Sequence, residues 1–197
     1  MELDKKAFAA MNKELAAYDA DREIIIKTSR DVLKASKAAV YALQRNEVKP
    51  AKAHLDAAKK TIKQLDKILA KDAHHAQTGA YNEALEEYIE ASCMLAVLHD
   101  NRLPTADELG VHTEVYLPGL CDLVGELVRK AINASINGDY EMPVRIRHFV
   151  SDLYNEMMLF DFRNTPVRKK FDAIKYGLEK LENLVLELKL KGKIRDA

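Results

Sequence analysis

The chain has 197 residues and carries 31 Lys and Arg against 31 Asp and Glu, so its formal net charge is zero, and 48% of its residues are hydrophobic. It has only 7 Gly and 5 Pro residues, and no apolar run approaches the roughly 18 to 20 residues of a membrane span. This composition excludes a disordered, fibrous or membrane-spanning chain and favours helices.

The length suits a single core, so we expect one helical domain over residues 1–197. The first residues lack the apolar stretch of a secretion signal, and both cysteines, Cys93 and Cys121, lie in apolar helical contexts. These features favour a reducing, cytoplasmic setting.

Apolar residues recur with helical spacing along the whole chain, and no segment alternates like a strand. The expected helices are a long first one ended by Pro50, then 51–70, 72–98, one from Pro118 to about 136, 143–160, and a last one opened by Thr165-Pro166, with 100–112 as the one long loop. The apolar stripe of the first helix is Phe8, Met11, Leu15, Tyr18, Ile25, Val32, Ala39 and Leu43. The predicted fold class is all-α, an up-and-down bundle of about six long helices.

Charge is sorted along the chain although the total is balanced. Residues 1–71 hold 16 basic and 10 acidic residues, residues 72–126 hold 1 and 11, and residues 127–197 hold 14 and 10. An acidic segment between basic ones suits a protein whose carboxylates hold a divalent cation beside a phosphate polymer.

In the third helix, Glu83, Glu87 and Glu90 share one face through their i, i+4, i+7 spacing, with Glu86 beside them. A solvated acidic face is the alternative interpretation, because Glu is common at exposed helix positions. However, no Lys or Arg occurs between residues 72 and 101 to relieve the repulsion.

In the fourth helix, Asp122 and Glu126 lie one turn apart within an apolar run. Asp is a poor residue in the middle of a helix and is costly to bury without a partner. That partner is either a metal ion or, alternatively, Arg129 or Lys130. Together with Glu87 and Glu90, these acids favour a site of oxygen ligands for Mg²⁺, with Mn²⁺ as the other candidate.

Other site chemistries lack their motifs. No histidine has a Glu three residues before it, as di-iron bundles require, and Asp72-x-x-His75 is a single near match. The sequence has no phosphate-binding glycine loop, nucleophile elbow or zinc motif.

The first helix carries a row of basic and aromatic residues roughly opposite its apolar stripe. The row is Lys27, Arg30, Lys34, Lys37, Tyr41 and Arg45. It could follow a phosphate backbone while Tyr41 offers a stacking surface, and a solvated basic face is the alternative. Two further basic groups, Arg145-Ile146-Arg147-His148 and Arg168-Lys169-Lys170, have a less determined role.

Several segments resemble a known family in order and spacing over nearly the whole chain. They are Ser29-Arg30-Asp31, Glu87-Tyr88-Ile89-Glu90-Ala91, Tyr116-Leu117 with Asp122-Leu123-Val124-Gly125-Glu126-Leu127, Asn137-Gly138-Asp139, and Lys169-Lys170-Phe171-Asp172-Ala173-Ile174-Lys175-Tyr176 with Leu190-Lys191-Gly192. The chain resembles the translin superfamily, and within it the branch of translin-associated factor X.

The resemblance implies a helical subunit that assembles into a closed, hollow octamer around single-stranded RNA or DNA. In that branch the acids belong to a Mg²⁺-dependent endoribonuclease, which implies catalytic roles here for Glu87, Glu90 and Asp122, with Glu126 as a fourth acid. The N-terminus is shorter than in larger relatives and the 100–113 loop is compact, so we expect a homo-octamer, with a complex of two subunit types as the alternative. The rival hypotheses are a translin-like scaffold that binds single strands without cutting them and a bundle that works through protein partners.

Overall fold

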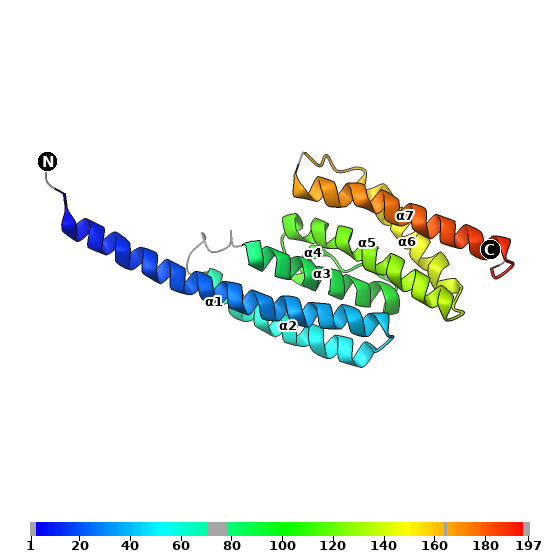
Figure 1. The fold of residues 1–197 in the computed structure, drawn as a ribbon, viewed down its shortest axis with the longest axis horizontal. Coiled ribbons are helices and arrows are strands. Elements are labelled where there is room, and N and C mark those ends of the chain that lie inside the picture. The colour runs from blue at the N-terminus through cyan, green and yellow to red at the C-terminus, as the bar shows by residue number, and fades with distance from the viewer. Residues whose placement is uncertain (1–2, 71–78, 164, 195–197) are drawn as a thin grey trace.

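The computed structural model describes residues 3–70, 79–163 and 165–194, which form seven α-helices and no strand (Figure 1). The helices are α1 (Lys5–Gln44), α2 (Val48–Leu69), α3 (Gly79–His99), α4 (Ala106–Leu109), α5 (Thr113–Ile136), α6 (Glu141–Met157) and α7 (Pro166–Leu190). The all-α class and the six long helices are therefore confirmed. The start predicted for the third helix, and with it Asp72 and His75, lies outside the described residues.

The one-turn helix α4 lies inside the segment predicted to be a loop. Thr105 and Glu108 form a capping box, in which each side chain accepts a hydrogen bond from the other residue's backbone N–H, and Gly110 ends the turn with φ of 71°. The Thr-x-x-Glu spacing is the sequence signal for this arrangement.

Two helix boundaries differ from those predicted at prolines. Pro50 does not end α1, which stops at Gln44; it lies in the first turn of α2, where a missing N–H costs nothing. Pro118 does not open α5 but lies inside it, because the helix already begins at Thr113. A proline inside a helix removes one backbone hydrogen bond, and the buried ring of Pro118 offsets part of that loss by packing in the core.

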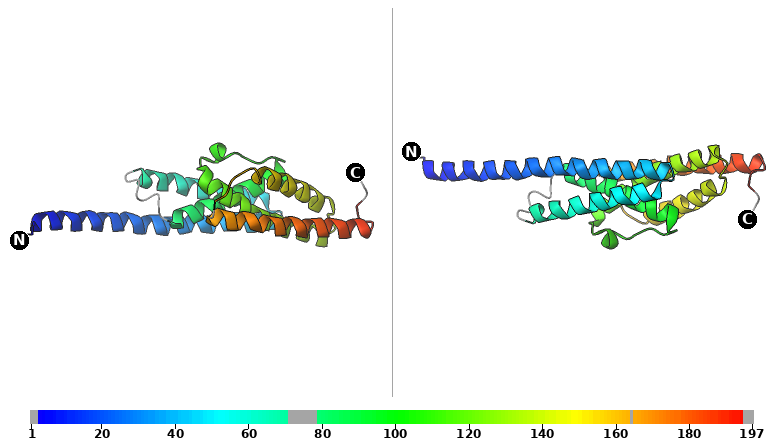
Figure 2. Two further views of the ribbon diagram at one scale, coloured as in Figure 1. Left: turned by 90° about the horizontal axis from the view of Figure 1, so that it is seen from above. Right: turned by 90° about the horizontal axis from the view of Figure 1, so that it is seen from below.

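The helices pack in a defined order that brings distant segments together. α1 contacts α2 and α3, α3 contacts α5, and α5 contacts both α6 and α7. The connection through α4 carries the chain back, so α3 and α5 run in the same direction (Figure 1). α1 and α7 lie along one side of the molecule, and α2, α4 and α6 lie on the other (Figure 2). The α1–α3–α5–α7 series positions the candidate site.

Only part of the stripe predicted on α1 faces the core. Ile25 and Val32 are fully buried, whereas Phe8, Met11 and Leu15 are 58%, 52% and 59% exposed. The N-terminal part of α1 extends beyond the other helices (Figure 1), so no other described part of the chain covers this apolar stretch.

Both cysteines are free and buried, as expected for small core residues. On the last helix, Phe171, Ile174, Leu181, Val185 and Leu188 are buried at helical spacing, and Val167 and Leu178 are half-buried. None of the helices within the described ranges combines the length and the apolarity that crossing a membrane requires.

Candidate functional site

Four acidic side chains predicted from the sequence line one hollow of about 240 Å³ between α1, α3 and α5. We call it the acidic hollow. Its lining residues are Lys37, Val40, Tyr41, Glu87, Glu90, Asp122, Gly125 and Glu126. The remaining acid of the predicted face on α3, Glu83, is exposed and does not line the hollow. The structure thus brings together the acids of two helices that are separate in sequence.

A close approach of α3 and α5 places these acids near one another. A Cβ atom on Gly119 would lie 2.8 Å from Ile89 Cγ2 and 3.0 Å from the carbonyl oxygen of Glu86. Only glycine fits such a gap without moving a neighbour, which explains its place in a helix that it otherwise weakens.

Glu90 is the most perturbed group in the hollow. Its side chain belongs to the core, with the residue only 7% exposed. Burial first, and then the nearby Glu87, Glu126 and Asp122, raise the pKa of Glu90 to about 8, against the opposing effect of Lys37. A carboxyl group in this setting holds its proton near neutral pH unless a cation approaches.

The other three acids have protein partners. Asp122 Oδ2 lies 2.5 Å from Lys170 Nζ on α7, and the same nitrogen lies 2.7 Å from Glu86 Oε2. Glu87 pairs with Lys37 at 3.2 Å. The predicted alternative of Arg129 or Lys130 as the partner of Asp122 is therefore wrong, because Lys170 fills that role.

Glu126 is held by polar contacts from α1 and its own helix. Gln44 Nε2 donates to Glu126 Oε2 at 2.7 Å and to the Glu126 carbonyl oxygen at 2.9 Å, and Arg129 approaches the carboxylate at 3.7 Å. With these side-chain positions, no three His, Cys, Asp or Glu residues of the described chain form a ready-made metal cluster.

Lys130 is a structural residue. It is 4% exposed, and its Nζ donates to the Leu43 carbonyl at 2.7 Å, to Asn46 Oδ1 at 2.7 Å and to the Gln44 carbonyl at 3.3 Å. These acceptors lie at the C-terminal end of α1, whose last carbonyls lack helical partners. Burial lowers the pKa of Lys130.

The structure divides the basic row predicted on α1. Lys37 and Tyr41 line the acidic hollow, and the Arg129 guanidinium lies 5.9 Å from the centre of the Tyr41 ring. Arg45 instead pairs with Glu47 at 2.7 Å, away from the acids. Lys27, Arg30 and Lys34 are exposed further toward the N-terminus of α1.

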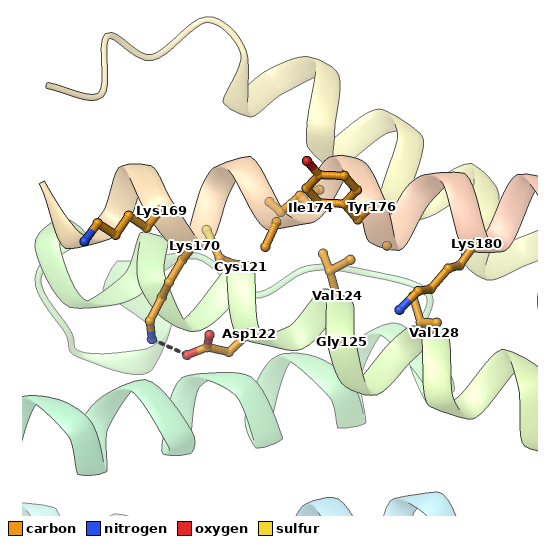
Figure 3. Close-up of a pocket in the computed structure, with 12 residues that line it drawn as sticks. Cys121, Asp122, Val124, Gly125, Val128, Lys169, Lys170, Ile174, Tyr176 and Lys180 are labelled. Carbon is orange, nitrogen blue, oxygen red and sulfur yellow. Dashed lines mark hydrogen bonds and ion pairs between the residues drawn. The ribbon is translucent and has the colours of Figure 1, made fainter. Parts of the chain in front are cut away.

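A second hollow of about 570 Å³, which we call the α5–α7 groove, adjoins the first (Figure 3). The two hollows share Asp122 and Gly125. The groove is lined by Cys121, Asp122, Val124, Gly125, Val128, Lys169, Lys170, Ala173, Ile174, Tyr176, Gly177 and Lys180.

Sequence reasoning missed Gln44, and it gave Glu86 and Lys170 no place in the site. These three residues make contacts that span 48 to 84 positions in sequence. The Lys169-Lys170 pair in the last helix was the one available signal, but nothing in the sequence assigns it to Asp122.

Comparisons with known proteins identify the family of the chain. Residues 20–192 match the translin family. Translin-associated protein X of Pongo abelii is 27% identical over 229 residues, covering 94% of this chain and 78% of the relative. Translin of Gallus gallus is 36% identical over 92 residues, which span 46% of this chain and only 40% of that protein.

Two solved structures share the fold. The crystal structure of apo-NeC3PO has a TM-score of 0.85 at 25% identity and covers 94% of this chain and 98% of its own. The structure of the AfC3PO–duplex RNA complex has a TM-score of 0.82 at 23% identity, with coverages of 94% and 97%. With the family match spanning most of its length, the chain belongs to the translin family.

Proposed function

We propose that this chain is a Mg²⁺-dependent endoribonuclease that cuts single-stranded RNA. The observation that carries the proposal is the buried Glu90, whose carboxyl group lies among three other acids. Perturbed carboxyl groups in a hollow are typical of functional sites. Burying like charges together costs stability, and a bound cation is what relieves that cost.

The donor set fits a hard divalent cation. Glu87, Glu90 and Asp122 would hold Mg²⁺, or Mn²⁺, through carboxylate oxygens, and Glu126 is the fourth acid at the same hollow. When bound, the ion would supply charge stabilisation at the scissile phosphate and lower the pKa of an attacking water. Lys37 and Lys170 balance part of the acidic charge in the structure described here.

The protein's own residues would orient the substrate. Lys37 and Tyr41 stand at the wall of the acidic hollow, where a phosphate and a base could contact them. Lys27, Arg30 and Lys34 would guide the strand along α1. Arg45 belongs to the proposed strand-binding row, although its pair with Glu47 competes with a phosphate.

A solved structure with the same fold supports RNA as the polymer, and an exposed apolar face on α1 supports self-association. AfC3PO, which shares the fold, was solved with duplex RNA. Phe8, Met11 and Leu15 form an exposed apolar face on α1, a kind of surface that marks protein contacts. We propose that a second copy of this chain covers it in a homo-octamer that encloses the strand, whether RNA or single-stranded DNA.

The test is cleavage of a labelled single-stranded RNA with Mg²⁺ or with EDTA, beside the matching duplex. Glu87→Gln, Glu90→Gln and Asp122→Asn should each abolish cleavage and leave binding in EDTA largely intact. Glu83→Gln is the matched control, because Glu83 lies on the same helix and outside the hollow. Products should carry a 5′-phosphate and a 3′-hydroxyl, since water attacks phosphorus and the 3′-oxygen leaves with a proton. Parental rates in the three acid variants would refute the assignment.

The alternative is a translin-like scaffold that binds RNA or DNA strands without cutting them. One observation favours it: Lys170 pairs with both Asp122 and Glu86, so these acids already share an internal cation. This alternative predicts salt-sensitive RNA binding and no Mg²⁺-dependent product in the same assay.

A further inference from the structure

The α5–α7 groove carries a charge pattern that the acidic hollow does not explain. Lys169, Lys170 and Lys180 line it from α7, and Asp122, the one acid in its lining, is already paired with Lys170. Lys180 reaches from α7 toward α5 beside Val128, and Lys169 lies at the other end of the groove (Figure 3). The groove therefore offers positive charge at both ends.

Gly125 lies where the two hollows meet, and the fold does not explain why it is glycine. It is exposed in the middle of α5, and a Cβ atom built on it would meet nothing within 4 Å. By contrast, a Cβ atom on Gly177 would lie 2.8 Å from Val124 Cγ1, so packing accounts for that glycine. Glycine is among the poorest helix formers, so Gly125 weakens α5 without serving any contact within the described chain.

Tyr176 adds an aromatic surface to the same groove. Its ring is labelled on α7 in Figure 3, and the residue is 64% exposed although it is a large side chain. Exposed aromatic rings beside lysines are the recurring elements of sites that bind single-stranded nucleic acid.

We propose that the substrate strand leaves the acidic hollow across Gly125 and continues along the α5–α7 groove, where Lys169 and Lys180 contact phosphates and a base stacks on Tyr176. This inference deepens the proposed function and rests on it. Glycine at position 125 then lets the strand pass close to the helix backbone. Lys169 and Lys180 are 11 residues apart on one helix, or about 16 Å, which equals four or five stacked nucleotides at about 3.4 Å each.

The test measures binding of a fluorescently labelled single-stranded RNA in EDTA, so that its outcome is independent of cleavage. The double variant Lys169→Gln/Lys180→Gln should lower affinity about tenfold at about 0.15 M salt, and reduce the slope of log affinity against log salt by about 1.4, at roughly 0.7 for each lost phosphate contact. Lys175→Gln is the matched control, because Lys175 is exposed on the same helix and does not line the groove.

Gly125→Ala separates the groove from a general loss of folding. We expect its thermal midpoint to rise, because alanine is the better helix former and its Cβ has open space, while its affinity for RNA falls. The proposal is overturned if the double variant binds like Lys175→Gln, or if Gly125→Ala binds RNA like the parent. It is also overturned if the double variant keeps its affinity but loses its oligomeric state, since the groove is then a contact between copies. Groove variants that lose cleavage but bind RNA like the parent would likewise refute the strand path. If the parental protein cuts no RNA but the groove variants bind it more weakly as expected, only the proposed nuclease activity is refuted.

Discussion

Replacing Glu90 with Gln should stabilise the protein in the absence of metal while abolishing cleavage. Gln has nearly the same shape and no charge to bury. The pKa of Glu90 rises from 4.5 to about 8 in the fold, mainly through burial. Between these two values the folded state therefore holds a proton that the unfolded state has released.

The sign and size of the effect follow from proton linkage. Because the folded state binds more protons between pH 4.5 and about 8, stability falls as pH rises through that window. Each tenfold change in proton affinity is worth about 1.4 kcal/mol, so the loss between pH 5 and pH 8 reaches about 3 kcal/mol. For a domain of this size that corresponds to roughly 10 °C in thermal midpoint.

The assay is thermal unfolding in EDTA at several pH values, for the parent, Glu90→Gln and Glu83→Gln. The parent and Glu83→Gln should lose stability from pH 5 to pH 8, while Glu90→Gln stays flatter and unfolds higher at pH 8. Parallel curves for the parent and Glu90→Gln would show that Glu90 is not desolvated, and the electrostatic reasoning about the hollow would then fail.

Three further results are expected. Lys130→Met should lower the free energy of unfolding by about 2 kcal/mol in urea titrations, because the Leu43 carbonyl and Asn46 Oδ1 lose their donor; unchanged stability would contradict the capping role. Gly119→Ala should cost about 1–3 kcal/mol, since the new methyl group overlaps Ile89, and calorimetry of this variant should show a lower midpoint. Mg²⁺ at about 100 times its dissociation constant should add about 2.7 kcal/mol of stability over EDTA, seen as a higher thermal midpoint, and no difference between the two conditions would argue against a metal site.

The sequence predicted the helices and the acids well because both depend on local spacing. Glu87 and Glu90 are three residues apart on α3, and Asp122 and Glu126 are four apart on α5, so each pair must share a face of its own helix. Predicting that the two pairs of acids meet also requires knowing that α3 packs against α5. Gly119 permits this contact, because Ile89 occupies the space that a side chain at that position would need.

The partners of the acids were out of reach of local reasoning. Lys170 is 48 residues from Asp122, and its neighbours in sequence give no sign that it faces α5. The apolar stripe predicted on α1 is buried only in part, and local reasoning missed this for a similar reason. Phe8 and Leu15 follow the same period as Ile25, but periodicity shows which residues share a face and cannot show where the bundle ends.

The electrostatics of the hollow separate the two functional hypotheses. In a scaffold that only binds strands, each acid beside a phosphate backbone opposes binding, so its best arrangement is full neutralisation by lysine. Asp122 and Glu86 approach that condition by sharing Lys170, and Glu87 approaches it through Lys37. Glu90 does not, because no Lys or Arg of the described chain forms an ion pair with it, and burial favours its protonated, neutral form. Such a residue destabilises the fold when the pH is above the ordinary pKa of a glutamate, and it contributes no contact to a surface that only binds strands. It becomes useful once a cation enters the hollow, which makes Glu90 the residue whose charge state distinguishes a nuclease from a scaffold.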